Sequence, residues 1–357
     1  MRSGRDSLDG HRDEAAAAAG QTVKALFVGG TGNLSSYAGA EARKRGIELV
    51  QINRGRALGV LGVAEGVETI VCDARDGAAL AKAVGRREFD VVLNFTAMEP
   101  LDIERDLNVF AGRTGQYVFL SSASAYQKPP PSHMVTEATP LGNPYWDYSR
   151  GKIAAESRLA ELGAEIGLAW TVVRPSHTYG RSWIPTPFGS SDFTLAARML
   201  AGKEVPVPGD GQALWTLTHA RDFAVGLVGL FGKAAALGQA FNVTGDEALS
   251  WDEVYRAIAA ALGVEARLVH VPMELVAKAA PEFGMKLLGD KGWSTLFDCS
   301  KLRALVPEFQ SRTRFAEGIR ESVAWFREDP LRQKQLPATE AAFEAMIAAW
   351  KRALLAA

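Results

Sequence analysis

Three polar residues stand at a spacing that suits proton transfer. Tyr148 and Lys152 lie four residues apart at the start of a predicted helix over 148–166, so their side chains share one helix face. A free tyrosine has a pKa of about 10, which a nearby ammonium group lowers by favouring the phenolate. Ser122 follows a strand-like run over 117–121. We expect Tyr148 to act as acid or base, Lys152 to tune it, and Ser122 to hold the substrate oxygen while hydride moves to or from carbon.

A glycine-rich stretch near the start of the chain suits the binding of a dinucleotide. It follows the apolar run 23–28 and opens a helical segment. Glycines at such a junction allow a tight turn and let backbone N–H groups approach a pyrophosphate. The third glycine position of a Gly-x-x-Gly-x-x-Gly pattern is Ser35, which is still small. A plain turn is the alternative, but the alternating elements that follow favour nucleotide binding. The residues expected to contact the cofactor here are Gly29, Gly30, Thr31, Gly32, Asn33 and Leu34.

The end of the second strand-like run is expected to lie near the adenosine ribose. It reads Asn53-Arg54-Gly55-Arg56 and lacks the carboxylate that would bind a ribose 2′-hydroxyl. Arg54 would instead bind a 2′-phosphate through forked hydrogen bonds, unless it is a solvated surface arginine. We therefore expect NADP or NAD, with NADP preferred. Asp73 is a candidate for the adenine edge or a turn-forming residue. Further candidates for the cofactor site follow the fourth strand-like run: Phe95, Thr96 and Ala97.

The elements that must position these residues alternate along the chain. Strand-like runs at 23–28, 47–52, 69–72, 91–94, 117–120 and 169–173 are separated by helical segments. This order predicts an α/β fold with a doubly wound Rossmann parallel sheet. The run 240–243 is expected to return to the sheet. We expect a flexible tail over 1–21, a Rossmann cofactor-binding domain over 22–180, a smaller and mostly helical substrate lobe over 181–335, and a C-terminal helix over 336–357.

Composition narrows the class of protein. Lys and Arg number 40 and Asp and Glu 41, so no net field attracts nucleic acid or an anionic membrane. No apolar run approaches the ~18 residues of a membrane span. Cys72 and Cys299 lack metal-ligand spacing and fit a reducing compartment. We expect a cytoplasmic enzyme with a small-molecule substrate, without metal, nucleic-acid or membrane partners, in which the C-terminal helix could support a homodimer.

These motifs resemble those of the extended short-chain dehydrogenases/reductases, within the NAD-dependent epimerase/dehydratase family, the group that contains UDP-galactose 4-epimerase. The resemblance covers roughly residues 22–330. It implies that Ser122, Tyr148 and Lys152 are catalytic. It also implies that a loop over 174–180, which includes Pro175 and His177, borders the nicotinamide. The segment 102–112 and the Asn-Arg-Gly turn are more similar to a branch that includes chloroplast stem-loop-binding proteins. The shared motifs are Gly29–Gly32, Ser121-Ser122, Tyr148-x-x-x-Lys152 and Arg174-Pro175-Ser176-His177-Thr178-Tyr179-Gly180.

The chain departs from this family where sugar-nucleotide members bind their substrate. Those members place Asn at the position of His177 and often Arg at that of Trp215. Both replacements weaken the case for a nucleotide-diphosphate sugar. The 4,6-dehydratases carry an Asp-Glu pair where this chain has Ala123 and Ser124, so dehydration is not expected. Ser124, His177 and Trp215 stay candidates for substrate contact. The alternatives are a backbone-bonded loop histidine and a core aromatic side chain.

Three functions are compatible with these residues. We expect an epimerase, which oxidises a secondary alcohol of a sugar or nucleotide sugar and reduces the transient ketone from the other face. The alternative is a one-way NADPH-dependent reductase or dehydrogenase of a non-nucleotide carbonyl compound. The third is an RNA-binding or scaffold protein on the same fold. The intact Ser122, Tyr148 and Lys152 and the balanced charge argue against it.

Overall fold

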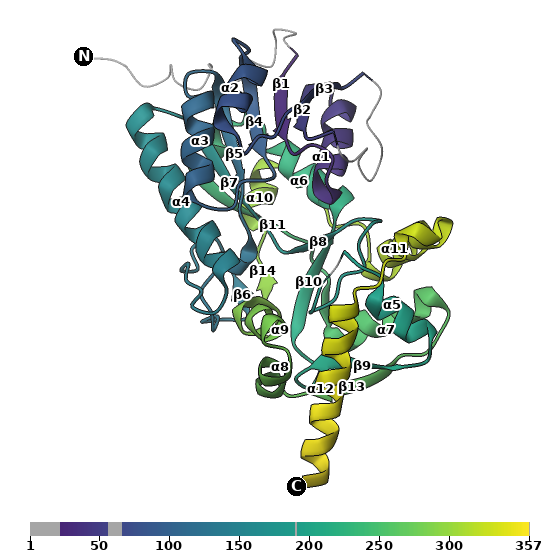
Figure 1. Cartoon of the computed structure of the whole chain (residues 1–357). Coiled ribbons are helices and arrows are strands. Elements are labelled where there is room, and N and C mark those ends of the chain that lie inside the picture. Colours follow the sequence, from purple (N-terminus) through teal and green to yellow (C-terminus); the bar gives the residue numbers. More distant parts are fainter. Residues whose placement is uncertain (1–21, 56–65, 190, 357) are drawn as a thin grey trace, which may run out of the picture.

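A single parallel sheet organises the first half of the protein. The computed structural model describes residues 22–55, 66–189 and 191–356, so the predicted tail over 1–21 and Arg56 lie outside the described residues. Within these residues the main sheet has seven strands in the order β11-β7-β5-β4-β1-β2-β3 (Figure 1). This is the doubly wound order of a Rossmann fold and confirms the predicted fold class. The strands are β1 (Lys24–Val28), β2 (Glu48–Asn53), β3 (Glu68–Val71), β4 (Phe89–Asn94), β5 (Thr114–Leu120), β7 (Trp170–Pro175) and β11 (Gln239–Val243).

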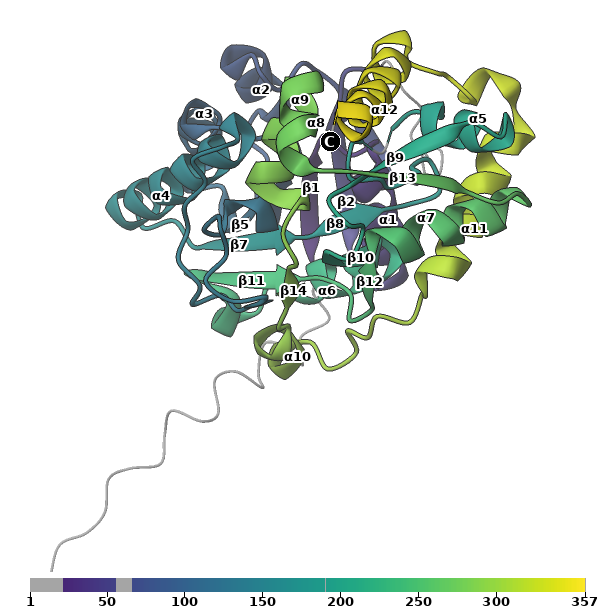
Figure 2. The same ribbon diagram turned by 90° about the horizontal axis from the view of Figure 1, so that it is seen from below.

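Helices cover both faces of this sheet, which explains why its strands are continuously apolar. Successive residues of a strand point to opposite faces. In β1, Ala25 and Phe27 pack with α1 and α6, whereas Leu26 and Val28 pack with α2, α3 and α4. Figures 1 and 2 show these two helical layers on either side of the strands. The helices are α1 (Asn33–Lys44), α2 (Gly77–Val84), α3 (Pro100–Phe110), α4 (Asp147–Ile166) and α6 (Ala220–Gly229).

The strand order creates a crevice between β1 and β4. These two strands are neighbours, yet α1 and α3 lie on opposite faces of the sheet. In open α/β sheets, ligands bind at such a switch point, outside the carboxyl ends of the strands. At the far edge β11 pairs in parallel with β7, with Phe241 opposite Val173, where the sequence predicts a returning strand. The sheet therefore draws on residues beyond position 200.

Most of the remaining elements build a second region with its own core around Trp215 and Trp251, whereas α10 packs with α6 and β11 against the main sheet. Helices make up most of the regular secondary structure of this region, as the sequence predicts, and three small sheets accompany them: β12-β10-β8, β13-β9 and β14-β6. Prolines at 206 and 208 read as loop signals, whereas both lie in β9. The strands are β6 (Met134–Val135), β8 (His177–Tyr179), β9 (Glu204–Pro208), β10 (Leu214–His219), β12 (Ala248–Ser250), β13 (Arg267–Val271) and β14 (Leu296–Phe297). The helices are α5 (Thr194–Leu200), α7 (Trp251–Leu262), α8 (Met273–Ala279), α9 (Pro281–Lys286), α10 (Ser300–Leu305), α11 (Phe315–Glu328) and α12 (Pro337–Ala356). Short turns of 3₁₀ or π geometry lie at Ala123–Ala125, Ala234–Ala236, Leu287–Lys291 and Pro330–Arg332.

The last helix packs only along part of its length. Phe343, Met346 and Ile347 of α12 are buried, whereas Leu354 and Leu355 are exposed, and Figure 1 shows the end of the helix extending beyond the other elements. No helix among the described residues combines the length and the apolar character that crossing a membrane requires.

A buried ion pair ties α4 to the sheet. The Arg174 guanidinium, at the end of β7, donates to both carboxylate oxygens of Glu156 on α4, at 3.0 and 2.5 Å. The same carboxylate accepts a hydrogen bond from Ser121, and Arg174 also donates to the Tyr126 hydroxyl at 3.1 Å. Because Glu156 and Arg174 are both buried, removal of one partner leaves an uncompensated charge inside the protein.

We expect Glu156→Ala to lower the free energy of unfolding by about 3–5 kcal/mol, the usual cost of breaking a buried pair. Glu161→Ala on the same helix is the control, because Glu161 is exposed and its ion pair, with the half-buried Arg158, is long at 3.4 Å. Urea denaturation followed by circular dichroism measures both. Equal stability of the two variants would show that the Glu156–Arg174 pair does not hold α4 in place.

Candidate active site

The turn after β1 is shaped by two glycines that touch neighbouring side chains. Gly29 has φ +85°, a left-handed conformation that favours glycine, and a Cβ there would lie 2.5 Å from Thr96 Cγ2. A Cβ on Gly30 would lie 2.7 Å from the side chain of Gln51. The backbone therefore passes close to β2 and to the loop after β4, and a side chain at either glycine would collide with them.

Ser35, at the third glycine position of the pattern, braces this turn. Its hydroxyl accepts a hydrogen bond from the Gly32 N–H at 2.7 Å and donates to the Gly29 carbonyl at 2.8 Å. Asn33 and Leu34 begin α1 directly after Gly32. The serine thus does more than fit in place of glycine, because it closes the turn by hydrogen bonding.

A cleft of about 560 Å³ opens at the carboxyl ends of β1 to β4. Its volume, its position and the tight glycine turn fit a dinucleotide, so these residues suit NAD or NADP. Five of the residues predicted to contact the cofactor do not line the cleft and belong to the segments next to it: Gly30, Gly32, Asn33, Leu34 and Ala97. The lining residues are Gly29, Thr31, Ile52, Asn53, Arg54, Cys72, Asp73, Ala74, Arg75, Phe95, Thr96, Met98, Glu99 and Asp102.

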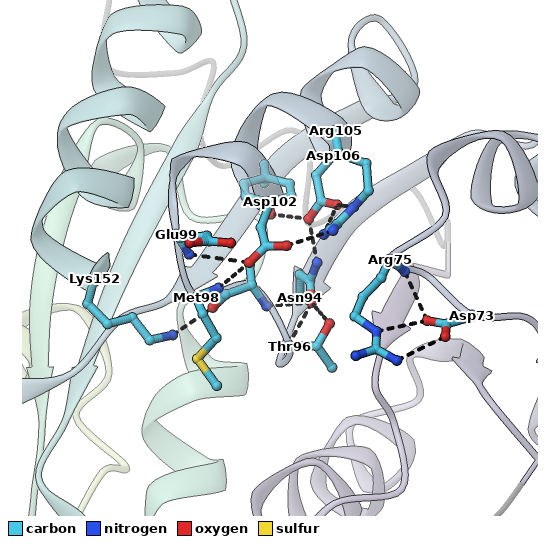
Figure 3. Close-up of polar contacts among 12 residues, drawn as sticks. Asp73, Arg75, Asn94, Thr96, Met98, Glu99, Asp102, Arg105, Asp106 and Lys152 are labelled. Carbon is cyan, nitrogen blue, oxygen red and sulfur yellow. Dashed lines mark hydrogen bonds and ion pairs between the residues drawn. The ribbon is translucent and has the colours of Figure 1, made fainter. Parts of the chain in front are cut away.

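The part of this cleft at the ends of β2 and β3 carries two arginines with different surroundings. Arg75 donates to both carboxylate oxygens of Asp73, at 3.2 and 3.1 Å, and these bonds lower the pKa of Asp73 to about 2 (Figure 3). Arg54 is exposed and forms no hydrogen bond or ion pair in the described part of the chain. Asp73 is therefore occupied by Arg75, whereas Arg54 is available to a ligand.

A buried polar network shapes the loop after β4, which forms one wall of the cleft (Figure 3). The Asn94 side-chain oxygen accepts hydrogen bonds from the backbone N–H groups of Thr96 and Ala97, at 2.7 and 3.2 Å. Its amide nitrogen donates to Asp106 of α3, which also accepts from the Tyr117 hydroxyl at 2.6 Å. Burial raises the pKa of Asp106, so the donors around it compensate for its position in the interior.

The same loop is held from a second side by Asp102. One carboxylate oxygen of Asp102 accepts from the N–H groups of Met98 and Glu99, at 2.7 and 3.2 Å, and Arg105 bridges Asp102 and Asp106. Sequence reasoning missed this network, because charged residues in a predicted helix usually face solvent. The signal that could have found it is the Asn94-x-Thr96 sequence directly after a strand.

Lys152 lies in the interior with its ammonium held by two carbonyl groups. Its Nζ donates to Ala97 O and Leu120 O, each at 2.7 Å. Only 3% of the residue is exposed, and burial lowers its pKa to about 8. The ammonium lies 5.8 Å from the centre of the Tyr148 ring. The predicted Tyr148–Lys152 neighbourhood is therefore present on one face of α4.

Tyr148 is hydrogen-bonded to Ser122, which belongs to a short chain of hydroxyl groups. Ser122 contacts Ser124 at 2.9 Å, and Ser149 donates to Ser124 at 2.8 Å. We expected Lys152 to lower the pKa of Tyr148, but burial raises it, and the Ser122 hydrogen bond opposes that rise only in part. Ser124 is buried behind Ser122, so it positions that residue and is not open to a substrate.

The segment predicted as a loop over 174–180 is mostly strand. β7 runs to Pro175, which is buried, and β8 begins at His177. His177 lines a second pocket, of about 250 Å³, and burial lowers its pKa. No cluster of three or more metal-binding side chains occurs in residues 22–55, 66–189 and 191–356.

Trp215 was a candidate for substrate contact, and its position does not allow this. The residue is 1% exposed and stacks on Trp251 with ring centres 5.9 Å apart, inside the core of the second region. Its indole N–H donates to the backbone carbonyl of Lys291 at 3.1 Å, and the Lys291 ammonium lies 4.4 Å above its ring. Trp215 therefore supports Lys291 from behind the pocket.

Comparison with known proteins agrees with this geometry. The model of the NAD dependent epimerase/dehydratase family matches residues 25–244. The chain is 27% identical to 2′-dehydrokanamycin reductase of Streptomyces kanamyceticus over 82% of this chain and 81% of that protein. It is 27% identical to the chloroplast stem-loop binding protein of 41 kDa b of Arabidopsis thaliana over 56% of this chain and half of that protein. UDP-glucose 4-epimerase of Mycolicibacterium smegmatis is 29% identical over 59% of this chain and 62% of its own.

Among solved structures, UDP-glucose 4-epimerase of Thermotoga maritima superposes with a TM-score of 0.69. The alignment covers 86% of this chain and 99% of that protein at 18% identity, so this likeness concerns the fold. The family match extends from β1 to the end of β11, across all strands of the main sheet. The chain therefore belongs to the NAD-dependent epimerase/dehydratase family, a group of short-chain dehydrogenase/reductase enzymes.

Proposed function

We propose that this protein is an NAD(P)-dependent oxidoreductase that interconverts a secondary alcohol and its ketone at Tyr148. The observation that carries the proposal is the Tyr148–Ser122 hydrogen bond with the Lys152 ammonium 5.8 Å from the phenol ring. Lys152 also donates to the carbonyl of Ala97, in the loop that borders the dinucleotide cleft. The loop after β4 thus contacts Lys152 on one side and borders the proposed cofactor site on the other.

The dinucleotide, when bound, accepts or supplies hydride. Gly29, Thr31, Asn53, Arg54 and Thr96 would hold it. The side chains of Tyr148, Ser122 and Lys152 would then bind the substrate oxygen and transfer the proton. Because burial raises the pKa of Tyr148, its phenol is protonated at neutral pH and can give a proton to a ketone oxygen.

The hydroxyl of Ser122 donates to that same oxygen and fixes its position. In the oxidation direction the Lys152 ammonium favours the phenolate that must take the proton. Since burial lowers the pKa of Lys152 to about 8, this ammonium is present at neutral pH and is lost as the pH rises above 8.

We expect Tyr148→Phe to reduce turnover by about 10²–10⁴-fold, because positioned acid–base catalysis is worth that much. Cofactor affinity should stay near that of the wild type. Tyr145→Phe is the control, since Tyr145 lies in the same segment and does not line the cleft. Steady-state kinetics and cofactor titration on both variants provide the measurement. Near-normal turnover of Tyr148→Phe would remove Tyr148 from the mechanism.

The proposed preference for NADP depends on Arg54. A hydrogen bond to a charged group contributes about 1.5–3 kcal/mol, so Arg54→Ala should weaken NADP at least tenfold and leave NAD nearly unchanged. Arg87→Ala is the matched control, because Arg87 pairs with Glu68 outside the cleft. Fluorescence titration of both dinucleotides measures the effect. Equal responses of NADP and NAD would show that Arg54 does not select the cofactor.

Epimerisation of a sugar-like alcohol is the form of this reaction that we propose from the family resemblance. One-way carbonyl reduction is the second candidate, favoured by His177 and the buried Trp215 at positions where sugar-nucleotide members carry Asn and often Arg. A protein named 2′-dehydrokanamycin reductase also aligns with most of this chain. The two reactions differ in the fate of the cofactor. An epimerase must retain it until hydride returns, whereas a reductase exchanges it at each turnover.

For an epimerase we expect protein purified without added cofactor to contain close to one dinucleotide per chain and to turn over without further addition. The measurement is denaturation followed by an assay of the supernatant, together with the number of reduced cofactors consumed per product. Consumption of one reduced cofactor per carbonyl reduced, by a protein isolated empty, would establish the reductase instead.

A further inference from the structure

A second pocket lies beside Trp146, two residues before Tyr148. Its volume is about 250 Å³, below the ~300–1,000 Å³ of sites for drug-sized ligands. A nucleotide sugar exceeds this space, whereas a molecule of monosaccharide size matches it. The lining residues are Trp146, His177, Thr186, Pro187, Phe188, Gly189, Lys286 and Lys291.

This pocket adjoins the acid–base group. The ring of Trp146, which lines it, lies 4.8 Å from the ring of Tyr148. Another wall includes Lys291, which ends the π-helical turn Leu287–Lys291, a form of backbone that is frequent at functional sites. Asn143 joins the two walls, because its side chain donates to Gly289 O at 2.5 Å and accepts from Trp146 N at 3.2 Å. A ligand in this pocket therefore contacts Trp146, whose ring packs against that of Tyr148.

The charges at the base of this turn do not balance. The Asp290 carboxylate, 5% exposed, faces two ammonium groups: Lys291 at 2.7 Å and Lys128 at 3.7 Å, whose side chains are 15% and 0% exposed. Lys286 adds a third cation to the lining, and none of the described lining residues is acidic. Positive charge in excess of its partners is costly in a partly buried site, so an anion from a ligand would stabilise it.

Lys291 is held in a fixed position. Its backbone carbonyl accepts hydrogen bonds from the indole N–H groups of Trp215 at 3.1 Å and Trp251 at 2.9 Å. Its ammonium lies 4.4 Å over the ring of Trp215. A cation fixed in this way loses little conformational entropy on binding, which favours recognition of a small anionic group.

We propose that the substrate is a compact organic anion, a polyol or ketone of monosaccharide size whose carboxylate or phosphate ester binds Lys291 and Lys286 while its reacting carbon faces Tyr148. This inference rests on the proposed alcohol–ketone chemistry and specifies its substrate class. It sets this chain apart from enzymes that hold their sugar through a nucleotide, and a polycationic amino sugar would meet repulsion at the lysines.

The test measures binding to the full-length protein saturated with reduced cofactor, on which an alcohol cannot be oxidised. Calorimetric titration compares the affinity of each acid with that of its neutral sugar: D-glucuronate with D-glucose, and D-galacturonate with D-galactose. D-Glucose 6-phosphate and UDP are titrated in the same way, and their affinities are compared with those of these four sugars. We expect at least one acid or sugar phosphate to bind tenfold or more tightly than its neutral partner, because contacts between ammonium and carboxylate or phosphate are charge-assisted.

Lys291→Met and Lys286→Met should each remove most of that advantage and leave the neutral sugars unchanged. Lys278→Met is the matched control, since Lys278 is exposed on α8 and does not line the pocket. Stronger dependence on the carboxylate or on the phosphate identifies which anion is bound. Three results would overturn the inference. The first is equal affinity within every pair of charged and neutral sugars, and the second is charge selectivity that survives both lysine variants. The third is tighter binding of UDP than of all the sugar anions. Because turnover is not measured, these outcomes are independent of the Tyr148→Phe result.

Discussion

The buried ammonium of Lys152 is the constraint on which the geometry of the site depends. An ammonium group inside a protein needs acceptors for its protons, and two of them come from Ala97 O and Leu120 O at 2.7 Å. Leu120 ends β5, and Ala97 lies three residues beyond β4, so one cation joins the ends of two adjacent strands. Its position in turn sets where α4 begins over the sheet, and hence where Tyr148 lies relative to Ser122.

This arrangement requires that the Ala97 carbonyl point inward, and the loop after β4 is built to achieve it. Asn94 and Asp102 take up the N–H groups of the loop, which leaves the Ala97 carbonyl oxygen to Lys152. Of the acidic residues of α3, Asp102 thus holds the backbone of this loop by hydrogen bonds and also lines the cleft, whereas Asp106 bonds to buried side chains. Since Thr96 and Met98 of the same loop line that cleft, Lys152 contacts a segment that also borders the cofactor site.

Local patterns in the sequence were sufficient to predict the Rossmann sheet, the glycine turn and the pair Tyr148 and Lys152, because each depends on neighbours within a few residues. Contacts between distant segments were not predictable in this way. Asp106 lies in a charged stretch of helix, and only the packing of α3 on the sheet buries it against Tyr117. Trp215 was expected near the substrate because of its position in the family pattern. Its burial follows from pairing of β10 with two other strands, which sequence periodicity does not reveal.

The electrostatics of Tyr148 depend on groups from both sides of the site. On the cofactor side, the Lys152 ammonium lies 5.8 Å from the centre of the Tyr148 ring and donates to two backbone carbonyl groups. On the substrate side, the Asp290 carboxylate raises the pKa of Tyr148, in the same direction as burial. Lys128 and Lys291 flank Asp290, so they offset a negative charge that would otherwise hold the proton on the phenol more firmly. The second region of the protein therefore contributes to the electrostatics of Tyr148 through Asp290, the carboxylate that Lys128 and Lys291 flank.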